Sequence, residues 1–257
     1  MLRFKSLGSG STGNATLVEA GGLFPTRLLV DCGIGPRQLA QRLGQAGLNI
    51  DDIDAIFITH EHSDHIGCAH LLSQRHRIPV WMSRGTQAAT SATDFGDLLH
   101  LARDGACVEV GGLQITPFGV PHDAREPLQL TCTDGAVKLG ILTDLGHATA
   151  HVMAHLQGCQ ALLLESNHDV DLLAQSAYPD FLKRRVGGLH GHLSNVMAAG
   201  LARDLMHGGL RHLVAAHLSA QNNRPALVQA LMSQTLGCRA TDIVIAGPVE
   251  GTPWLTL

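Results

Sequence analysis

Short runs of β-branched and aliphatic residues, separated by glycine, proline and polar positions, recur along the whole chain. Such runs are typical of β-strands. The pattern predicts strands at RFKSL (3–7), ATLVEA (15–20), RLLVD (27–31), AIFITH (55–60), PVWMS (79–83), LQITPFGV (113–120), LQLTC (128–132), VKLGILTD (137–144), ALLLES (161–166), HLVAAH (212–217) and DIVIAG (242–247).

Helical periodicity alternates with these strands. Residues 35–47 carry Leu39 and Leu43 one helical turn apart and end at a glycine, and residues 195–209 are apolar at helical spacing up to paired glycines. Early strands follow one another through short turns, whereas later strands alternate with helices. We therefore expect a single α/β domain over residues 1–257. The pattern is compatible both with a doubly wound sheet and with two sheets stacked between helices.

Composition supports a globular protein with a large core. Hydrophobic residues make up 45% of the chain and charged residues 16%, and the apolar runs are too short to cross a bilayer. The first residues lack the long apolar stretch and cleavage site of a secretory signal. We expect a cytoplasmic protein with no membrane partner.

Charge and cysteine spacing exclude two further classes. A formal net charge of −4 argues against a protein whose whole surface coats nucleic acid, although a local basic patch is compatible with it. The cysteines are scattered without a CxxC pair, so neither a thiolate zinc site nor a redox dithiol is indicated. The cysteines are at positions 32, 68, 107, 132, 159 and 238.

The segment THEHSDHIG (59–67) concentrates imidazole and carboxylate groups on one loop after a predicted strand. His60 and His62 are two positions apart, so their side chains point the same way if the chain leaves the strand extended. Asp64 and His65 reach a neighbouring point as the next helix begins. Nitrogen and oxygen ligands without thiolate suit zinc, manganese or iron. The alternative is that Asp64 caps that helix and the histidines are surface residues.

A metal centre needs ligands from elsewhere, because one loop cannot close the coordination shells of two cations. Single residues that could ligate a metal lie where three later predicted strands end. These are His122, Asp144 and His217. One edge of a sheet could gather them around the loop at residue 60, which predicts a cleft lined by metal ligands.

The order HxHxDH, then single His, Asp and His residues at strand ends, resembles the metallo-β-lactamase superfamily. The resemblance implies an α/β fold, an αβ/βα four-layer sandwich of two β-sheets flanked by helices, with a two-metal centre at one edge. It also implies the ligand sets: His60, His62 and His122 for the first metal, Asp64, His65 and His217 for the second, with Asp144 bridging them.

Several stretches resemble one branch of that superfamily, the YycJ/WalJ exonuclease group, whose members act on DNA from 5′ to 3′. The resemblance covers nearly the whole chain. It is carried by GSGSTGN (8–14), PHDAREP (121–127), LESNHD (164–169), YPDFLKRRVGGLHGHLSN (178–195) and AHLSAQNNRP (216–225).

Paired divalent cations, roughly 3.5–4 Å apart, can share a hydroxide and clamp the attacking and leaving oxygens of a phosphodiester. Asp64 and Asp144 would anchor metal and orient the water. The chain is thus expected to be an enzyme, a dinuclear-metal-dependent phosphodiesterase with a metal-bridging hydroxide, zinc, manganese or iron as cofactor, and DNA as substrate. The nucleic-acid part rests on the resemblance, and the sequence implies nothing about oligomeric state.

A further group must protonate the departing oxygen, and His192 is the candidate. It precedes Ser194, a predicted helix cap, so it stands near a helix N-terminus that favours phosphate. The segment resembles the HST element of the transfer-RNA 3′-processing branch. Alternatively, His192 only supports the capping loop. Glu165, Asn167 and His168 could orient metal ligands from outside or form ordinary strand-end hydrogen bonds.

Candidate phosphate contacts lie in two polar stretches. The basic triplet 183–185 is one candidate. Lys183 and Arg184 should face outward from a helix whose apolar stripe contains Tyr178, Phe181 and Leu182, although a solvated face explains the triplet equally well. Ser219 and Asn222 follow the predicted ligand His217 and are candidate phosphate donors. The GSGSTGN turn is a weaker phosphate cradle and more often a hairpin connection.

Two alternatives to a DNA exonuclease remain. One is a hydrolase of the same fold that cleaves a small cyclic phosphodiester, a thioester or a lactam. The other is a binding subunit without catalysis, although loss of activity in such folds usually removes ligands and all of them are present here.

Overall fold

The computed structural model describes residues 1–90 and 94–257, and within them the strands form two seven-stranded mixed sheets. The first sheet has the order β14 (Leu255–Thr256), β1 (Leu2–Gly8), β2 (Ala15–Ala20), β3 (Thr26–Val30), β4 (Ala55–Phe57), β5 (Val80–Ser83), β6 (Leu99–Ala102). The second has the order β13 (Ile243–Ile245), β12 (His212–Ala216), β11 (Ala161–Glu165), β10 (Lys138–Leu142), β9 (Leu128–Thr133), β8 (Leu113–Gly119), β7 (Val108–Val110).

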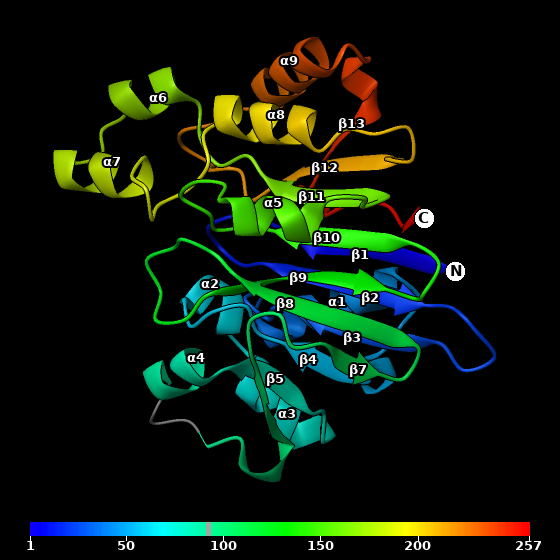
Figure 1. The fold of residues 1–257 in the computed structure, drawn as a ribbon. Coiled ribbons are helices and arrows are strands. Elements are labelled where there is room, and N and C mark those ends of the chain that lie inside the picture. Colours follow the sequence, from blue (N-terminus) through cyan, green and yellow to red (C-terminus); the bar gives the residue numbers. More distant parts are fainter. Residues whose placement is uncertain (91–93) are drawn as a thin grey trace.

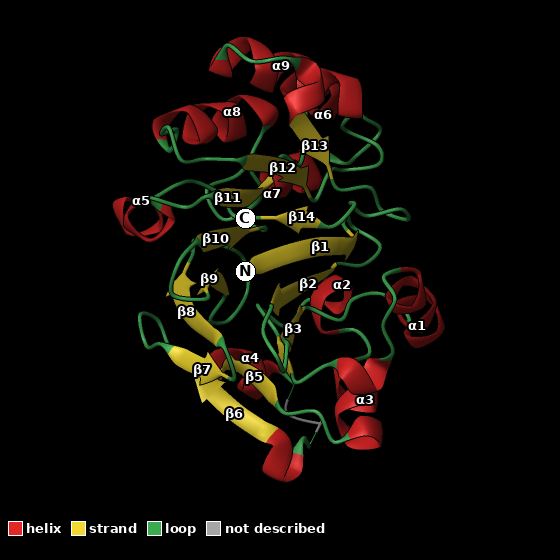
Figure 2. Ribbon diagram, turned by 90° about the vertical axis from the view of Figure 1, so that its right-hand side faces the viewer, coloured by secondary structure: helices red, strands yellow, loops and turns green. Residues whose placement is uncertain are grey.

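Helices cover the outer faces of the two sheets (Figures 1 and 2). Helices α1 and α3 lie on the first sheet, and α5, α8 and α9 lie on the second. The helices are α1 (Pro36–Gln45), α2 (Ser63–Ile66), α3 (Ala69–His76), α4 (Arg84–Ala89), α5 (Ala150–Leu156), α6 (Val170–Gln175), α7 (Asp180–Val186), α8 (Asn195–Asp204) and α9 (Pro225–Leu236). The predicted four-layer αβ/βα sandwich is confirmed.

Strand alternation explains the layers. Neighbouring side chains of a strand point to opposite faces of its sheet, so a strand buried on both faces is apolar throughout. In β11, Leu163 joins the core between the sheets, whereas Leu162 and Leu164 pack under the helices. In β1, Phe4 faces the second sheet and Leu7 faces the helical layer.

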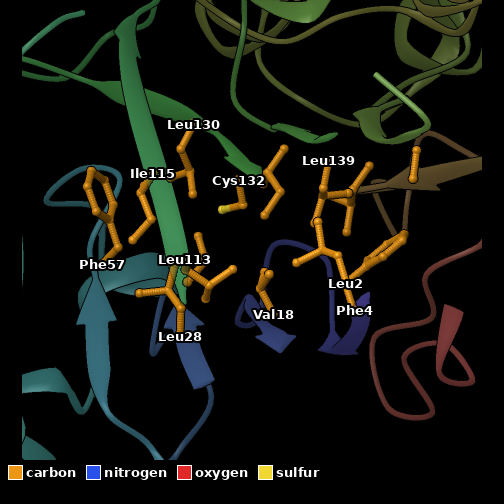
Figure 3. Packing of buried hydrophobic residues seen from close by; sticks show 14 of the residues in the cluster. Leu2, Phe4, Val18, Leu28, Phe57, Leu113, Ile115, Leu130, Cys132 and Leu139 are labelled. Atoms are coloured by element: carbon orange, nitrogen blue, oxygen red, sulfur yellow. The ribbon is translucent and has the colours of Figure 1, made fainter. Parts of the chain in front are cut away.

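The core between the sheets is almost entirely aliphatic and aromatic (Figure 3). Leu28 and Phe57 from the first sheet meet Ile115, Leu130 and other residues from the second, and all of these are buried. Each such side chain contributes about 1.5–3 kcal/mol by leaving water. This packing sets the relative position of the sheets and therefore of the loops at their edges.

Strand direction brings the predicted ligands to one edge. Strands β10, β11 and β12 are parallel, and β8 runs in the same direction because it is antiparallel to β9, which is antiparallel to β10. In the first sheet, β3 and β4 are parallel. A backbone hydrogen bond of 3.0 Å from Leu128 N–H to Thr59 O links the two sheets there.

The predicted strands all lie on observed strands, and the missed strands are β6, β7 and β14. All of the missed strands are short and stand at sheet edges, where one face or side is solvated and alternation is weak. The apolar stripe predicted on α7 is wrong as a buried face, because Phe181 is 67% exposed. Among the described residues, no helix is both long and apolar enough to span a membrane.

Candidate metal centre

The loop between β4 and α3 enters the site through a short helix. The chain runs from β4 through a bend at Glu61 to His62, which is the N-cap of α2, and Asp64 lies in the first turn of that helix. The loop is anchored to the segment after β3, where Cys32 N–H donates to His65 O at 2.7 Å. Gly33 has no room for a Cβ atom, because the Asp64 carbonyl occupies that position.

One group of ring nitrogens converges from β4 and β8. His60 Nε2 lies 3.1 Å from His62 Nδ1, and His122 Nε2 lies 3.4 Å from the same His62 atom. His60 and His122 are buried. The other ring nitrogen of His122, Nδ1, donates to Gly191 O at 3.1 Å, so Nε2 carries its lone pair toward the group.

A second group adjoins the first. His65 Nε2 lies 3.6 Å from Asp64 Oδ2, and His217 Nε2 lies 3.5 Å from the same oxygen. Asp144 stands between the groups, with Oδ2 3.0 Å from His65 Nε2 and Oδ1 3.8 Å from His122 Nε2. The structure therefore brings every predicted metal ligand to one place, in the two sets that the resemblance implied.

These distances suit divalent cations. Two ligand atoms about 2.0–2.1 Å from one tetrahedral ion lie about 3.3 Å apart, close to the separations within both groups. Asp144 Oδ2 and His217 Nε2 are buried without a hydrogen-bond partner among the described residues, which is costly unless a ligand satisfies them. The donors present therefore fit a centre of divalent metal ions.

Asp31 orients one side of the centre, although its place at a strand end was the only sequence signal for it. Its Oδ2 accepts from His65 Nδ1 at 2.8 Å, and its Oδ1 accepts from Thr59 N–H at 2.9 Å. The Thr59 hydroxyl also contacts His60 Nδ1 at 3.0 Å. These contacts hold both imidazoles with Nε2 toward the centre. Carboxylates outside the ligand shell of a metal commonly orient histidines in this way.

Glu165 orients the other side. Glu165 is the last residue of β11, and its Oε1 accepts from His217 Nδ1 at 2.9 Å and from His192 Nδ1 at 2.8 Å. Three backbone N–H groups, including those of Asp144 and Leu145, donate to the same carboxylate. Glu165 thus fixes a ligand, a bridging position and a cleft histidine at once.

The β1–β2 turn 8–14 is the predicted hairpin connection between antiparallel strands, and it also supports the centre. Asn14 Nδ2 lies 3.2 Å from both Asp64 O and His65 Nε2, and Asn14 N–H donates to Asp64 O at 2.8 Å. Ser9 Oγ accepts from His217 N–H at 2.8 Å. The turn therefore connects the two ligand loops through hydrogen bonds.

Left-handed backbone turns three site residues inward. Asp31, Asp144 and His217 have φ values of 63°, 54° and 54°, and each follows the end of a strand. Such conformations are uncommon for residues other than glycine and cost about 1–3 kcal/mol each. Their concentration here indicates that the surrounding hydrogen bonds hold strain to aim these side chains.

Burial and neighbouring charges set different protonation states around the centre. Burial holds the pKa of His60 well below its usual value and also lowers the pKa of His122, so both rings are neutral. Burial opposes ionisation of Asp144, yet His217 and His65 hold its pKa well below normal. Burial alone would lower the pKa of His217, but Asp144 and other carboxylates raise it to about 10. The buried carboxylates therefore favour a positive charge at this position.

The ligands open onto a cleft of about 350 Å³. His192 lines it, 21% exposed, and with Nδ1 on Glu165 its Nε2 is on the opposite side of the ring. Arg185, the last of the three basic residues of α7, also lines the cleft and is paired with Asp123. The sequence predicted a phosphate-contacting triplet at 183–185 but not this ion pair, and the helical pattern could not say which of the three residues faces the cleft.

The predicted substrate contacts lie elsewhere. Lys183 Nζ donates to Ala174 O at 2.7 Å, Arg184 is exposed, and neither lines the cleft. Asn222 is 1% exposed and does not line it either. Ser219 lines a neighbouring pocket of about 290 Å³ that shares Ser11 with the cleft.

The remaining candidates support the loops. Asn167 Nδ2 donates to His217 O at 2.9 Å, and the buried His168 donates no side-chain bond to a ligand within the described chain. Ser194 is the N-cap of α8, as predicted, and accepts from Met197 N–H at 3.3 Å.

Comparison with known proteins identifies the family and the fold. The family model described as the β-lactamase superfamily domain matches residues 26–218. The structure resembles the metallo-β-lactamase fold protein YhfI from Bacillus subtilis with a TM-score of 0.76 over 100% of both chains, at 17% identity. It resembles zinc-bound PqqB from Methylobacterium extorquens with a TM-score of 0.74 over 99% and 100% of the chains, at 16% identity.

Fold and centre together define a metal-dependent hydrolase of the metallo-β-lactamase superfamily. Sequence comparison narrows the class. The chain is 35% identical to exodeoxyribonuclease YycJ of Bacillus anthracis over 91% of its length and 89% of the relative's. It is 30% identical to exodeoxyribonuclease WalJ of Streptococcus pneumoniae over 91% and 88%. The chain belongs to the YycJ/WalJ group of this superfamily.

Substitution of Glu165 tests the outer support of the centre. In Glu165→Gln, one amide oxygen replaces two carboxylate oxygens, and the amide N–H₂ opposes the N–H groups that Glu165 now accepts. We expect zinc affinity to fall about 10–100-fold. Competition with a chromogenic chelator measures it, with Glu109→Gln at an exposed position of β7 as control. Equal affinities of the two variants would contradict this role.

Proposed function

We propose that this protein is a DNA exonuclease, working from 5′ to 3′, whose single hydrolase domain spans residues 1–257. The convergence of all the predicted His and Asp ligands on one open cleft carries the proposal. The names of its relatives, exodeoxyribonucleases matched over about nine-tenths of the chain, support DNA as the substrate class.

Two divalent ions would occupy the centre, zinc or manganese, with iron also compatible with the donors. His60, His62 and His122 would hold one, Asp64, His65 and His217 the other, and Asp144 would reach both through its separate oxygens. When bound, such a pair ionises water at neutral pH and offsets the charge of a phosphodiester. Asp64 and Asp144 would fix the ions and, with them, the position of the water.

His192 would donate a proton to the departing 3′ oxygen. Its ring lies beside the ligands, 3.4 Å from Asp144 Oδ1 through Nδ1, while Glu165 fixes its orientation. The free side of the ring therefore faces the cleft that would contain the scissile phosphate. A proton donor at this position matches the need of an alkoxide leaving group.

Arg185 would contact the DNA backbone at the cleft. Arg185 lies where α7 meets the cleft, and its guanidinium forms an ion pair with Asp123. A guanidinium binds phosphate through paired hydrogen bonds, so it suits a substrate whose recognition depends on the backbone. Lys183, Arg184, Ser219 and Asn222 remain weaker candidates, of which Ser219 alone lines a pocket next to the cleft.

Digestion of end-labelled DNA tests the function. Linear duplex and single-stranded DNA carrying a label at either end is incubated with the protein and added manganese or zinc. We expect early release of labelled mononucleotide from the 5′ label and gradual shortening of strands labelled at the 3′ end. Asp64→Ala removes a ligand and should lower the rate at least about 100-fold.

Other products would contradict the proposal. Internal fragments would indicate an endonuclease, and loss of the 3′ label first would reverse the polarity. Intact DNA together with rapid hydrolysis of small esters would favour a small-molecule hydrolase of this fold.

Replacing His192 separates proton donation from metal binding. We expect His192→Ala to keep its metal and to lose about 10²–10⁴ in kcat on DNA. A nucleoside 5′-p-nitrophenyl phosphate, whose leaving group needs no proton, should be hydrolysed at nearly the wild-type rate. His190→Ala, two residues away and exposed, is the control. Unchanged turnover of DNA by His192→Ala would remove the assignment.

Basic residues of α7 can be compared directly. We expect Arg185→Ala to raise KM for DNA about tenfold, and to reduce the salt dependence by about one phosphate contact, because one charged contact is lost. Lys183→Ala and Arg184→Ala should stay within about twofold of wild type, since neither lines the cleft. A larger KM effect at Lys183 or Arg184 than at Arg185 would reverse the ranking.

A further inference from the structure

We propose that Asp104, His151 and His155 form a second metal site, for a single zinc ion, on the surface of the second sheet. Its three donor atoms lie within 4.8 Å of one another and belong to none of the groups at the catalytic cleft. The site is independent of the proposed nuclease function.

The two histidines share a face of α5. They are four positions apart, which places their side chains one above the other on a helix. Their ring centroids are 4.6 Å apart. His155 also stacks on Phe118 of β8, with 4.9 Å between ring centroids and 13° between planes, so its ring has a fixed orientation. A His pair with this spacing can bind one cation through both rings.

Asp104 approaches the pair from the turn between β6 and β7. Its Oδ1 accepts from His151 Nε2 at 2.8 Å and from Gly119 N–H at 3.2 Å. No hydrogen bond to Asp104 Oδ2, or to either ring nitrogen of His155, occurs in the described parts of the chain. These atoms are free to bind a cation.

The donor chemistry suits zinc. Two imidazoles and one carboxylate, with a water at the fourth position, are a common zinc ligand set. Burial lowers the pKa of His155, which keeps its ring neutral, and contact with His151 holds the pKa of Asp104 below normal despite partial burial. Lys138 is the neighbouring positive charge, and its ammonium group is engaged by Gln157 O at 3.0 Å.

Small adjustments would close the coordination shell. Donors of one tetrahedral zinc lie about 3.3 Å apart, and the three donor atoms here lie within 4.8 Å of one another. The side chains of His151 and Asp104 are 46% and 54% exposed, so both can move at little cost. A bound ion would join α5 to the β6–β7 turn across β8, the strand that leads to His122.

Zinc content after dialysis tests the site. Wild type and His151→Ala/His155→Ala are equilibrated against the same buffered zinc solution, and bound zinc is counted by elemental analysis. Because both proteins retain the catalytic ligands, we expect the variant to hold about one equivalent less than wild type. His70→Ala/His76→Ala removes two other surface histidines, on α3, and should match wild type.

Asp104→Asn gives a second readout. It should bind the additional equivalent at least about tenfold more weakly, because a neutral amide replaces a charged ligand. Circular dichroism checks that all variants are folded. Equal zinc content in wild type and His151→Ala/His155→Ala, or equal loss in the His70/His76 control, would overturn the site.

Discussion

Buried negative charge is the constraint around which this fold is built. Asp31, Asp144 and Glu165 are each 4% exposed or less and lie within one network with Asp64 and the site histidines. Carboxylates removed from water are stable only beside positive charge or several hydrogen-bond donors. Protons on His65 and His217 meet part of that need, and divalent cations would meet it more completely.

The same carboxylates determine how the ligands are presented. Asp31 and Glu165 accept hydrogen bonds from Nδ1 of His65 and His217, which leaves Nε2 of both rings for the metal. His62 differs, because its Nδ1 faces the neighbouring rings. Rings held in this way need little rearrangement when a cation binds, and left-handed backbone at the strand ends contributes to their aim.

The cleft chemistry and the peripheral cluster depend on the same strand from two sides. Strand β8 ends just before His122, while Phe118 and Gly119 near its end contact His155 and Asp104. Because packed strands move as units, an ion on α5 and one in the cleft would be coupled through this segment only if β8 shifts. The geometry connects the two sites physically and leaves their donors separate.

Individual residues show which features of the fold and site could be predicted from the sequence. The run of apolar positions in β11 and β12 determined two-sided burial, and HxHxDH with its strand-end partners determined the metal-binding chemistry. Periodicity did not choose between one doubly wound sheet and two stacked sheets, since both bury such strands. The resemblance to a known superfamily made that choice, and the structure confirms it.

Local sequence determined which groups could bind metal, because ligand chemistry belongs to the side chain itself. Only the tertiary structure decided that Asp31 and Glu165 orient them, that Arg185 rather than Lys183 reaches the cleft, and that Asp104 meets a helix some fifty residues later. These outcomes depend on the packing of distant segments and on the rotation of short helices, which no periodicity encodes.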